Sequence, residues 1–212
     1  MSVALSAFIP DLVLSLPGCS NMQAERAVLL AAIRMAREGL ILQEDLADIT
    51  VTAGDDTHTV DTPSAETTTC AVVSAKFNDT YLTPLSYLDI DSGRNIGAAR
   101  TDVPGNPFGY LQYKEQEIVL LPAPIAAGTL KVRVAFAPSD TATTIDDLFG
   151  GRHRDALLSG AFSQLLVIPK QSFTDTGLAA YHKGAFEAHI ARERGTVTIG
   201  FSRAPLRVVP AH

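Results

Sequence analysis

Residues 145–212 read IDDLFGGRHRDALLSGAFSQLLVIPKQSFTDTGLAAYHKGAFEAHIARERGTVTIGFSRAPLRVVPAH, and this segment predicts two helices followed by an extended arm. Asp146 or Asp147 can cap a first helix near Leu148, because a short acidic side chain accepts hydrogen bonds from free backbone N–H groups. Apolar residues spaced by three and four then share one broad face. Pro169 ends this helix because proline has no N–H to donate.

A second helix is predicted at residues 177–194. Asp175 or Thr176 can cap its start, and Gly195 is suited to end it in the left-handed conformation. Two helices joined by so short a loop predict an antiparallel helical hairpin.

Residues 196–212 differ in character, because they combine prolines, arginines and apolar side chains without any acid. Proline at this density prevents a helix and discourages a central strand, which predicts an extended arm. A frayed chain end is one interpretation. The other is an arm that docks on another subunit or a partner, because the segment is rich in apolar residues for a disordered tail.

The N-terminal part is also predicted to be helical. Residues 3–16 favour a short helix, and Ser20 with Gln23 forms a capping box in front of a long helix at residues 21–38. Alanines along one face of this helix permit close packing against another helix. Gly39 is the expected C-cap.

Residues 41–138 have β character, with about six short strands expected in a small sandwich or barrel. The segments 49–52 and 57–60 flank Gly54 and predict a hairpin. Residues 91–109 predict a long loop, and residues 130–137 alternate between apolar and basic side chains, as a strand with one buried face does.

The predicted fold class is therefore α+β, with a helical body that contains an inserted small antiparallel β domain and an extended C-terminal arm. The expected divisions are residues 1–42 and 141–195 for the helical body, 43–140 for the β-rich domain and 196–212 for the arm.

Composition excludes several classes of protein. The net charge of −6 argues against nonspecific nucleic-acid binding. Cys19 and Cys70 are too few for a disulfide framework and predict buried free thiols. No signal peptide and no membrane span is recognisable, which predicts a cytosolic product that makes no membrane contact.

No catalytic constellation is recognisable, so we expect neither an enzyme nor a cofactor. The triplet formed by His153, Arg154 and Asp155 matches part of a kinase catalytic loop, but the asparagine expected after it is absent and the triplet is better explained as a charged helix start. His182 and His189 lie on one predicted helix face, with a spacing that is not typical of a two-histidine zinc helix. Surface or interface histidines are the preferred interpretation, and no metal site is predicted.

Taken together, the sequence resembles the head-to-tail adaptor (connector) proteins of tailed bacteriophages. The resemblance spans nearly the whole chain, and its most specific part is the C-terminal ending. It rests on the motifs FIP (8–10), LPGC (16–19), AAIR (31–34), VLLPAP (119–124), LKVRVAFAPS (130–139), GAF (160–162), LL (165–166), AAY (179–181), Phe186 and GFSRAPLRV (200–208). The sequence departs from such adaptors at residues 39–42, where aromatic residues are expected after the first long helix.

The resemblance implies a structural protein of the virion neck, made in the host bacterial cytoplasm. Such adaptors form a ring, usually a dodecamer, beneath the portal protein. They extend the channel through which the genome DNA passes without specific binding, and they offer a docking surface to the downstream neck or tail protein. The arm would bind the portal, and its implied portal-binding residues are Phe201, Arg203, Pro205, Leu206, Arg207 and Val208.

Two other functions stay open. One is a tail terminator or other neck or tail component, which would form a ring on the tail tube. The other is a β-type module that binds a carbohydrate or a partner through residues 91–109.

Overall fold

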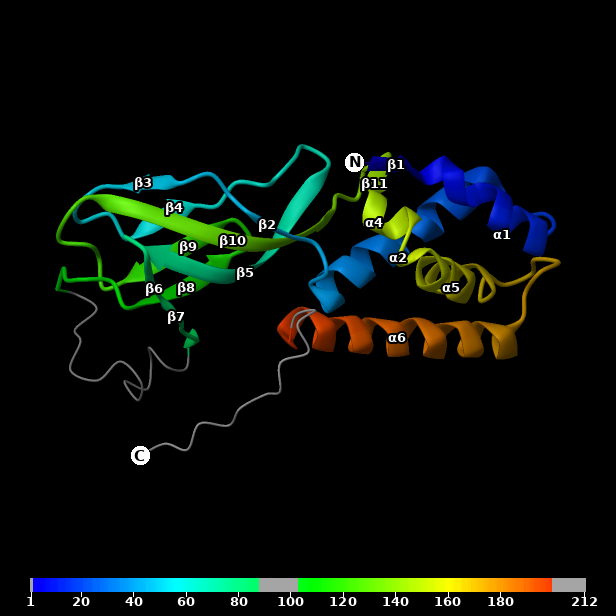
Figure 1. The fold of residues 1–212 in the computed structure, drawn as a ribbon. Helices are drawn as coiled ribbons and strands as arrows, with labels where there is room; N and C mark the ends of the chain where they lie inside the picture. Colours follow the sequence, from blue (N-terminus) through cyan, green and yellow to red (C-terminus); the bar gives the residue numbers. More distant parts are fainter. Residues whose placement is uncertain (1, 88–102, 200–212) are drawn as a thin grey trace, which may run out of the picture. The chain divides into compact units, whose positions relative to one another are not determined.

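A computed structural model describes residues 2–87 and 103–199 (Figure 1). The chain divides into two compact units. The helical unit comprises Met1–Ile41 and Pro138–His212, and the β unit comprises Leu42–Ala137.

The helical unit contains six helical segments and two short strands among its described residues. They are β1 (Ser2–Ala4), the 3-10 helix η1 (Leu5–Phe8), α1 (Ile9–Ser15), α2 (Asn21–Gly39), β11 (Thr144–Asp146), α4 (Asp147–Gly150), α5 (Arg154–Leu165) and α6 (Thr176–Ile199). Strands β1 and β11 pair antiparallel, with Val3 opposite Ile145. This pair ties the start of the chain to the segment that leads into α4 and α5.

The starts of two helices confirm the predicted caps. The Ser20 hydroxyl accepts from Gln23 N at 3.3 Å and Gln23 Oε1 accepts from Ser20 N at 3.1 Å, so the capping box of α2 is complete. Asp175 Oδ1 accepts from Leu178 N at 2.9 Å in the first turn of α6. Both contacts satisfy N–H groups that have no partner within the helix.

The predicted ends of the two long helices are wrong. Gly39 is still helical, and the left-handed residue is Leu40, with φ of 50°. A Cβ on Gly39 would meet Ile41 Cγ2 at 3.2 Å, a close contact that the Ile41 side chain would relieve by moving a few tenths of an ångström. Gly195 likewise continues α6, which runs to Ile199 because adding residues to an existing helix is far easier than starting one.

The core of the helical unit forms where α2, α5 and α6 pack together. Small residues bring the helices close: a Cβ on Gly160 of α5 would meet Ala31 of α2 at 2.9 Å and Phe186 of α6 at 2.8 Å. Phe186 is 1% exposed and Ala31 is fully buried. This contact follows the alanine face that the sequence predicts for the first long helix.

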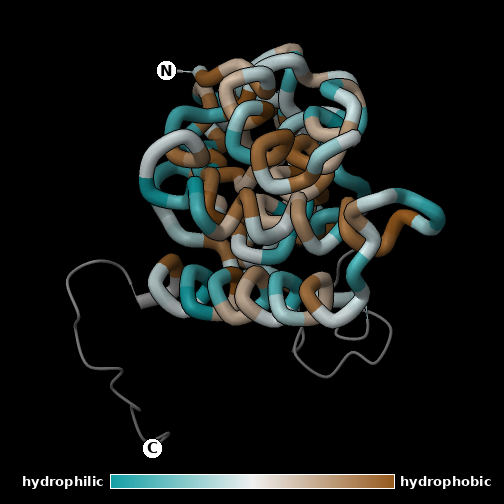
Figure 2. The backbone as a smooth tube through the Cα atoms, turned by 90° about the vertical axis from the view of Figure 1, so that its right-hand side faces the viewer, coloured by the Kyte–Doolittle hydropathy of each residue, from teal (hydrophilic) through white to brown (hydrophobic). Residues whose placement is uncertain are grey.

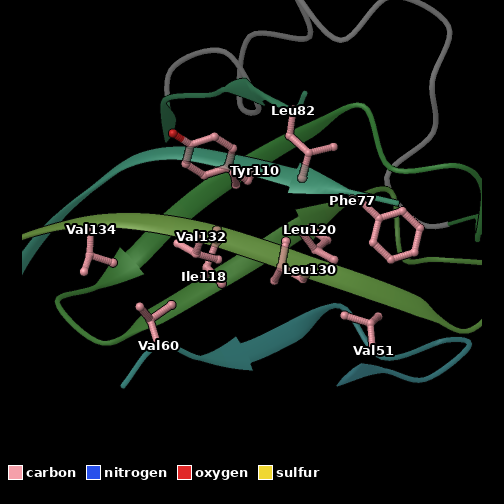
Figure 3. Packing of buried hydrophobic residues seen from close by; sticks show 11 residues of the cluster. Val51, Val60, Phe77, Leu82, Tyr110, Ile118, Leu120, Leu130, Val132 and Val134 are labelled. Atoms are coloured by element: carbon pink, nitrogen blue, oxygen red, sulfur yellow. The ribbon is translucent and has the colours of Figure 1, made fainter. Parts of the chain in front are cut away.

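The β unit contains nine strands among its described residues, in two sheets. The strands are β2 (Gln43–Asp45), β3 (Ile49–Val51), β4 (Thr57–Thr59), β5 (Thr67–Phe77), β6 (Thr80–Tyr81), β7 (Thr83–Pro84), β8 (Gly109–Lys114), β9 (Glu117–Leu121) and β10 (Gly128–Pro138). One sheet has the order β2-β10-β5-β6, with β3 also on β10, and the other has the order β4-β9-β8-β7. Apolar side chains from both sheets pack together into one hydrophobic core (Figure 3).

Strand β10 shows the predicted alternation of buried apolar and exposed basic side chains. Leu130, Val132 and Val134 are buried, whereas Lys131 and Arg133 face solvent. The two basic side chains pair with acids of neighbouring segments, Lys131 with Asp79 at 2.8 Å and Arg133 with Asp45 at 2.6 Å. One face of the strand is therefore core and the other is an exposed ion-pair surface.

The predicted hairpin around Gly54 is wrong, although the turn exists. Gly54 has φ of 84° and donates its N–H to Pro124 O at 2.7 Å. The flanking strands do not pair with each other, because β3 pairs with β10 and β4 pairs with β9. Pairing with distant strands thus overrides the local turn signal. The predicted loop at residues 91–109 lies largely outside the described residues.

The predicted fold class is also wrong. The protein is a mixed α/β structure with about 38% helix and 29% strand and a curled multi-stranded sheet. The β part is not small, since β5 and β10 each have 11 residues, and it is not purely antiparallel, since β7 runs parallel to β8. The helices share their unit with β1 and β11, and residues expected at the start of the arm belong to α6.

No helix in the described part of the chain is long and apolar enough to cross a membrane. Figure 2 shows that hydrophilic and hydrophobic residues are mixed along the helices. Neither cysteine forms a disulfide; Cys19 is buried as expected, whereas Cys70 is half-buried.

Candidate functional site

The residues predicted to bind a portal are not placed by the structure. Phe201, Arg203, Pro205, Leu206, Arg207 and Val208 all lie outside the described residues, which end at Ile199. The structure describes the helix α6 that precedes them, and elsewhere it contains a buried polar cluster and several surface grooves.

The polar cluster lies in the helical unit and contains His153, His189, Glu193 and Arg152. His153 Nδ1 and His189 Nε2 are 2.9 Å apart, and Arg152 Nη2 donates to Glu193 Oε2 at 2.7 Å. One nitrogen of each imidazole and one carboxylate oxygen of Glu193 all lie within 4.8 Å of one another. We call these three residues with Arg152 the His–Glu cluster.

Local structure explains how these side chains meet. His189 and Glu193 are four residues apart on α6, so they share one helix face. His153 is the N-cap residue of α5 and makes no side-chain capping bond, which leaves its ring to contact α6. The ring of Phe149 stands 6.5 Å from the His153 ring, centroid to centroid, and forms part of its surroundings.

The cluster is unusually well buried for polar groups. His153 is 1% exposed and Glu193 is 6% exposed. Charged glutamates are almost never buried unless they are paired, so the contact with Arg152 accounts for the burial of Glu193. The guanidinium side chain of Arg152 is 40% exposed and connects the cluster to solvent.

Burial lowers the pKa of His153 and of His189 below the ordinary histidine value of 6.5. The Glu193 carboxylate acts in the opposite direction on both pKa values, and Arg152 acts in the same direction as burial. Both rings are therefore neutral at neutral pH. The short contact between them requires one ring to donate and the other to accept.

This cluster was not predicted from the sequence. His182 and His189 were expected on one helix face, but His182 stacks on Phe162 at 5.0 Å between ring centroids and is not part of the cluster. The partner of His189 comes from a different element and cannot be read from spacing on α6. The four-residue spacing from His189 to Glu193 is the signal that could have found half of the cluster.

The kinase-like triplet has a structural role here, as its interpretation as a helix start predicts. Arg154 Nη2 donates to Asp11 Oδ2 at 2.7 Å and to Ala7 O at 3.2 Å. Its guanidinium carbon lies 4.7 Å from the ring centroid of Phe8. Arg154 thus fastens the N-terminal segment to α5.

A groove with an apolar lining lies on the surface of α2 and α5, with a volume of about 340 Å³. Met22 and Leu30 line it from α2 and Leu165 lines it from α5, and Ile168 follows on the loop. Met22 is 80% exposed. We call this surface the α2–α5 groove.

A second groove on the β unit is polar, with a volume of about 480 Å³. Its walls carry Asp45, Lys131 and Arg133 of the ion pairs on β10, with Lys76 stacked 4.3 Å from the Tyr81 ring centroid. The opposite charges compensate one another across this groove. It therefore offers no surface of a single sign to a charged ligand.

No protein-family model matches the chain, and a search of curated proteins finds no similar sequence.

Proposed function

We propose that this protein is a structural head-to-tail adaptor of a tailed bacteriophage, which forms a ring beneath the portal and docks the tail. The observation that carries the proposal is the segment GFSRAPLRV at residues 200–208, which resembles the ending of such adaptors. It follows directly on α6, a helix of 24 residues. The protein would reside in the virion neck after synthesis in the host cytoplasm.

Ring formation requires each subunit to present two different faces to its neighbours. The α2–α5 groove supports the proposal because exposed apolar side chains gathered in one place mark protein–protein contacts. Met22 and Leu30 are its exposed apolar residues on α2. The net charge of −6 suits a protein that DNA passes without binding.

The portal contact is tested by co-sedimentation of the purified protein with portal rings. The full chain is compared with a version that ends at Ile199, which leaves α6 whole and removes the predicted arm. We expect the full chain to sediment in stoichiometric amount and the shortened chain to stay in the supernatant. A full-length variant with Phe201→Asp and Leu206→Asp keeps the length of the arm and changes only its apolar residues. It shows whether these side chains, and not merely the presence of the arm, are needed for sedimentation.

The outcomes separate the candidate functions. Sedimentation of both versions would assign docking to residues 1–199 and would keep the adaptor function. Failure of the full chain to sediment would overturn portal binding. Binding to purified tail tubes instead would identify a tail terminator or another tail component.

Ring formation is tested by mixing the protein with purified portal rings and measuring the mass of the resulting assembly in solution. We expect Met22→Asp with Leu30→Asp to abolish the ring, because charge in an apolar contact is desolvated without a partner. Val73→Asp is the matched control, since Val73 is an exposed apolar residue of the β unit. If the variant with Met22→Asp and Leu30→Asp forms rings of unchanged mass, the α2–α5 groove is not a contact between ring subunits.

A further inference from the structure

We propose that His153, His189 and Glu193 bind a divalent transition-metal ion, with Zn²⁺ as the preferred ion. This inference concerns the helical unit alone and does not depend on the adaptor function. It starts from the donor set, because two imidazole nitrogens and one carboxylate oxygen are ligands that zinc takes in proteins. Three protein ligands leave a fourth position for water.

The distances fit a metal after small side-chain rotations. Zinc bonds to nitrogen and oxygen are about 2.0–2.2 Å long, so two ligand atoms on a tetrahedral ion lie about 3.4 Å apart. The two imidazole nitrogens are 2.9 Å apart, and no pair of donor atoms in the set exceeds 4.8 Å. The imidazole pair would open by roughly 0.5 Å and the carboxylate would approach by at most about 1.4 Å.

Proton balance does not oppose binding. Of the two imidazole nitrogens that face each other, one carries the proton that the other accepts. A neutral imidazole can move this proton to its opposite ring nitrogen, which frees the lone pair that faces the ion. Each histidine would then bind as a neutral ligand, and Glu193 would bind as a carboxylate.

The surroundings hold the ligands in place. Arg152 donates to one oxygen of Glu193, and such a bond to a ligating carboxylate fixes its orientation. Phe149 stands beside His153 and contributes apolar surface to the site. Because His153 belongs to the start of α5 and the other two ligands belong to α6, a bound ion would fasten the C-terminal half of α6 to the α4–α5 turn.

The alternative is a purely structural cluster, in which the imidazole pair and the Arg152–Glu193 ion pair satisfy one another. The two cases differ in whether Zn²⁺ binds to the folded protein. The full-length protein is prepared without a polyhistidine tag, freed of metal with EDTA, dialysed, and titrated with Zn²⁺ in a calorimeter. We expect one ion per chain and a rise in the melting temperature of the helical unit.

Glu193→Gln and His189→Gln test the ligands. Each should weaken Zn²⁺ binding by at least about tenfold, because loss of even an outer partner of a ligand costs about 10–100-fold in affinity. His182→Gln is the matched control, since His182 lies on the same helix and stacks on Phe162 away from the cluster. The control should bind Zn²⁺ with the affinity of the unchanged protein and show the same rise in melting temperature.

Co²⁺ gives a second measurement that needs no variant. A four-coordinate or five-coordinate Co²⁺ ion absorbs visible light strongly, whereas a six-coordinate ion on the surface absorbs weakly. Strong absorption that Zn²⁺ removes is the expected result. The proposal is overturned if the unchanged protein binds no Zn²⁺, if binding is unaffected by both ligand variants, or if bound Co²⁺ is six-coordinate.

Discussion

Gly160 of α5 lies directly against the ring of Phe186 of α6: a Cβ on Gly160 would stand 2.8 Å from Phe186 Cε2. The same Cβ would stand 2.9 Å from Ala31 of α2, so three helices meet at this one position. Real side chains essentially never approach so closely. Glycine is therefore required at position 160 by the close packing of the three helices and does not mark a helix end.

Gly160→Ala should destabilise the helical unit by roughly 1 kcal/mol, the difference between two opposing effects. Forcing a methyl group into a filled core costs about 1–3 kcal/mol, and the better helix propensity of alanine returns at most about 1 kcal/mol. The measurement is denaturant unfolding followed by helical circular dichroism. Unchanged or increased stability would contradict the close approach to Phe186 and Ala31.

Gly184→Ala should have the opposite effect and serves as the control for Gly160→Ala. Gly184 is an exposed residue of α6, and a Cβ there would meet no heavy atom within 4 Å. Alanine is favoured over glycine in a helix interior by about 0.8–1.0 kcal/mol. We expect the same unfolding experiment to show stabilisation of roughly 0.5–1 kcal/mol; a loss of stability would indicate that α6 is not helical at this position.

Ser20→Ala should lower the stability of the helical unit by about 0.5–2 kcal/mol, because it removes the hydroxyl that accepts from Gln23 N. Ser15→Ala is the control: the Ser15 hydroxyl donates to Asp11 O within α1, and such bonds do not stabilise helices. Thermal unfolding of the two variants in parallel gives the comparison. Equal effects would argue against the capping box.

Leu130→Ala should destabilise the β unit by about 2–5 kcal/mol, because it leaves a cavity in the core shown in Figure 3. Leu130 is fully buried on β10. Val73→Ala on β5 removes a side chain that is 38% exposed and should cost much less. Tyrosine fluorescence during urea unfolding reports on the β unit through Tyr110. Similar losses of stability for Leu130→Ala and Val73→Ala would contradict the assignment of Leu130 to the buried face and Val73 to the exposed face.

His182 should make the helical unit less stable in acid. Burial lowers the pKa of His182 below 6.5, and its Nδ1 is buried without a hydrogen-bond partner. The unfolded chain therefore takes up a proton at a higher pH than the folded protein. The free energy of unfolding is then greatest above pH 6.5 and falls as the pH decreases from 6.5 toward the lower folded-state pKa.

His182→Phe tests this dependence, since phenylalanine keeps a ring against Phe162 and Tyr181 but takes up no proton. Melting temperatures are measured in EDTA across the range from neutral to mildly acidic pH. The variant should lose less stability than the unchanged protein over this range. An identical pH profile would show that His182 does not contribute.

Several elements could be predicted because their signals are local. The capping box at Ser20, the acidic cap at Asp175 and the alternation from Leu130 to Val134 depend on residues within a few positions of one another. Hydrogen bonds to free helix N–H groups and the two-residue period of a strand follow from backbone geometry alone. The portal-binding residues predicted for the arm stay a prediction, since they lie outside the described residues.

Tertiary structure decided the features that depend on distant partners. Strand β1 exists because β11 pairs with it, and the strands beside Gly54 separate because β3 pairs with β10 and β4 pairs with β9. These pairings join residues far apart in sequence, and the loop-closure entropy that they cost is invisible to local patterns. The fold class was predicted wrongly for this reason.

The sequence by itself determined where α2 and α6 begin and which face of β10 is buried, because these follow from hydrogen-bonding and apolar periodicities along the chain. The tertiary structure alone decided that His153 meets His189 and Glu193, and that Gly160 meets Phe186. Such contacts arise from the packing of one helix on another. Their distances are fixed by side-chain volume in three dimensions and not by spacing in the sequence.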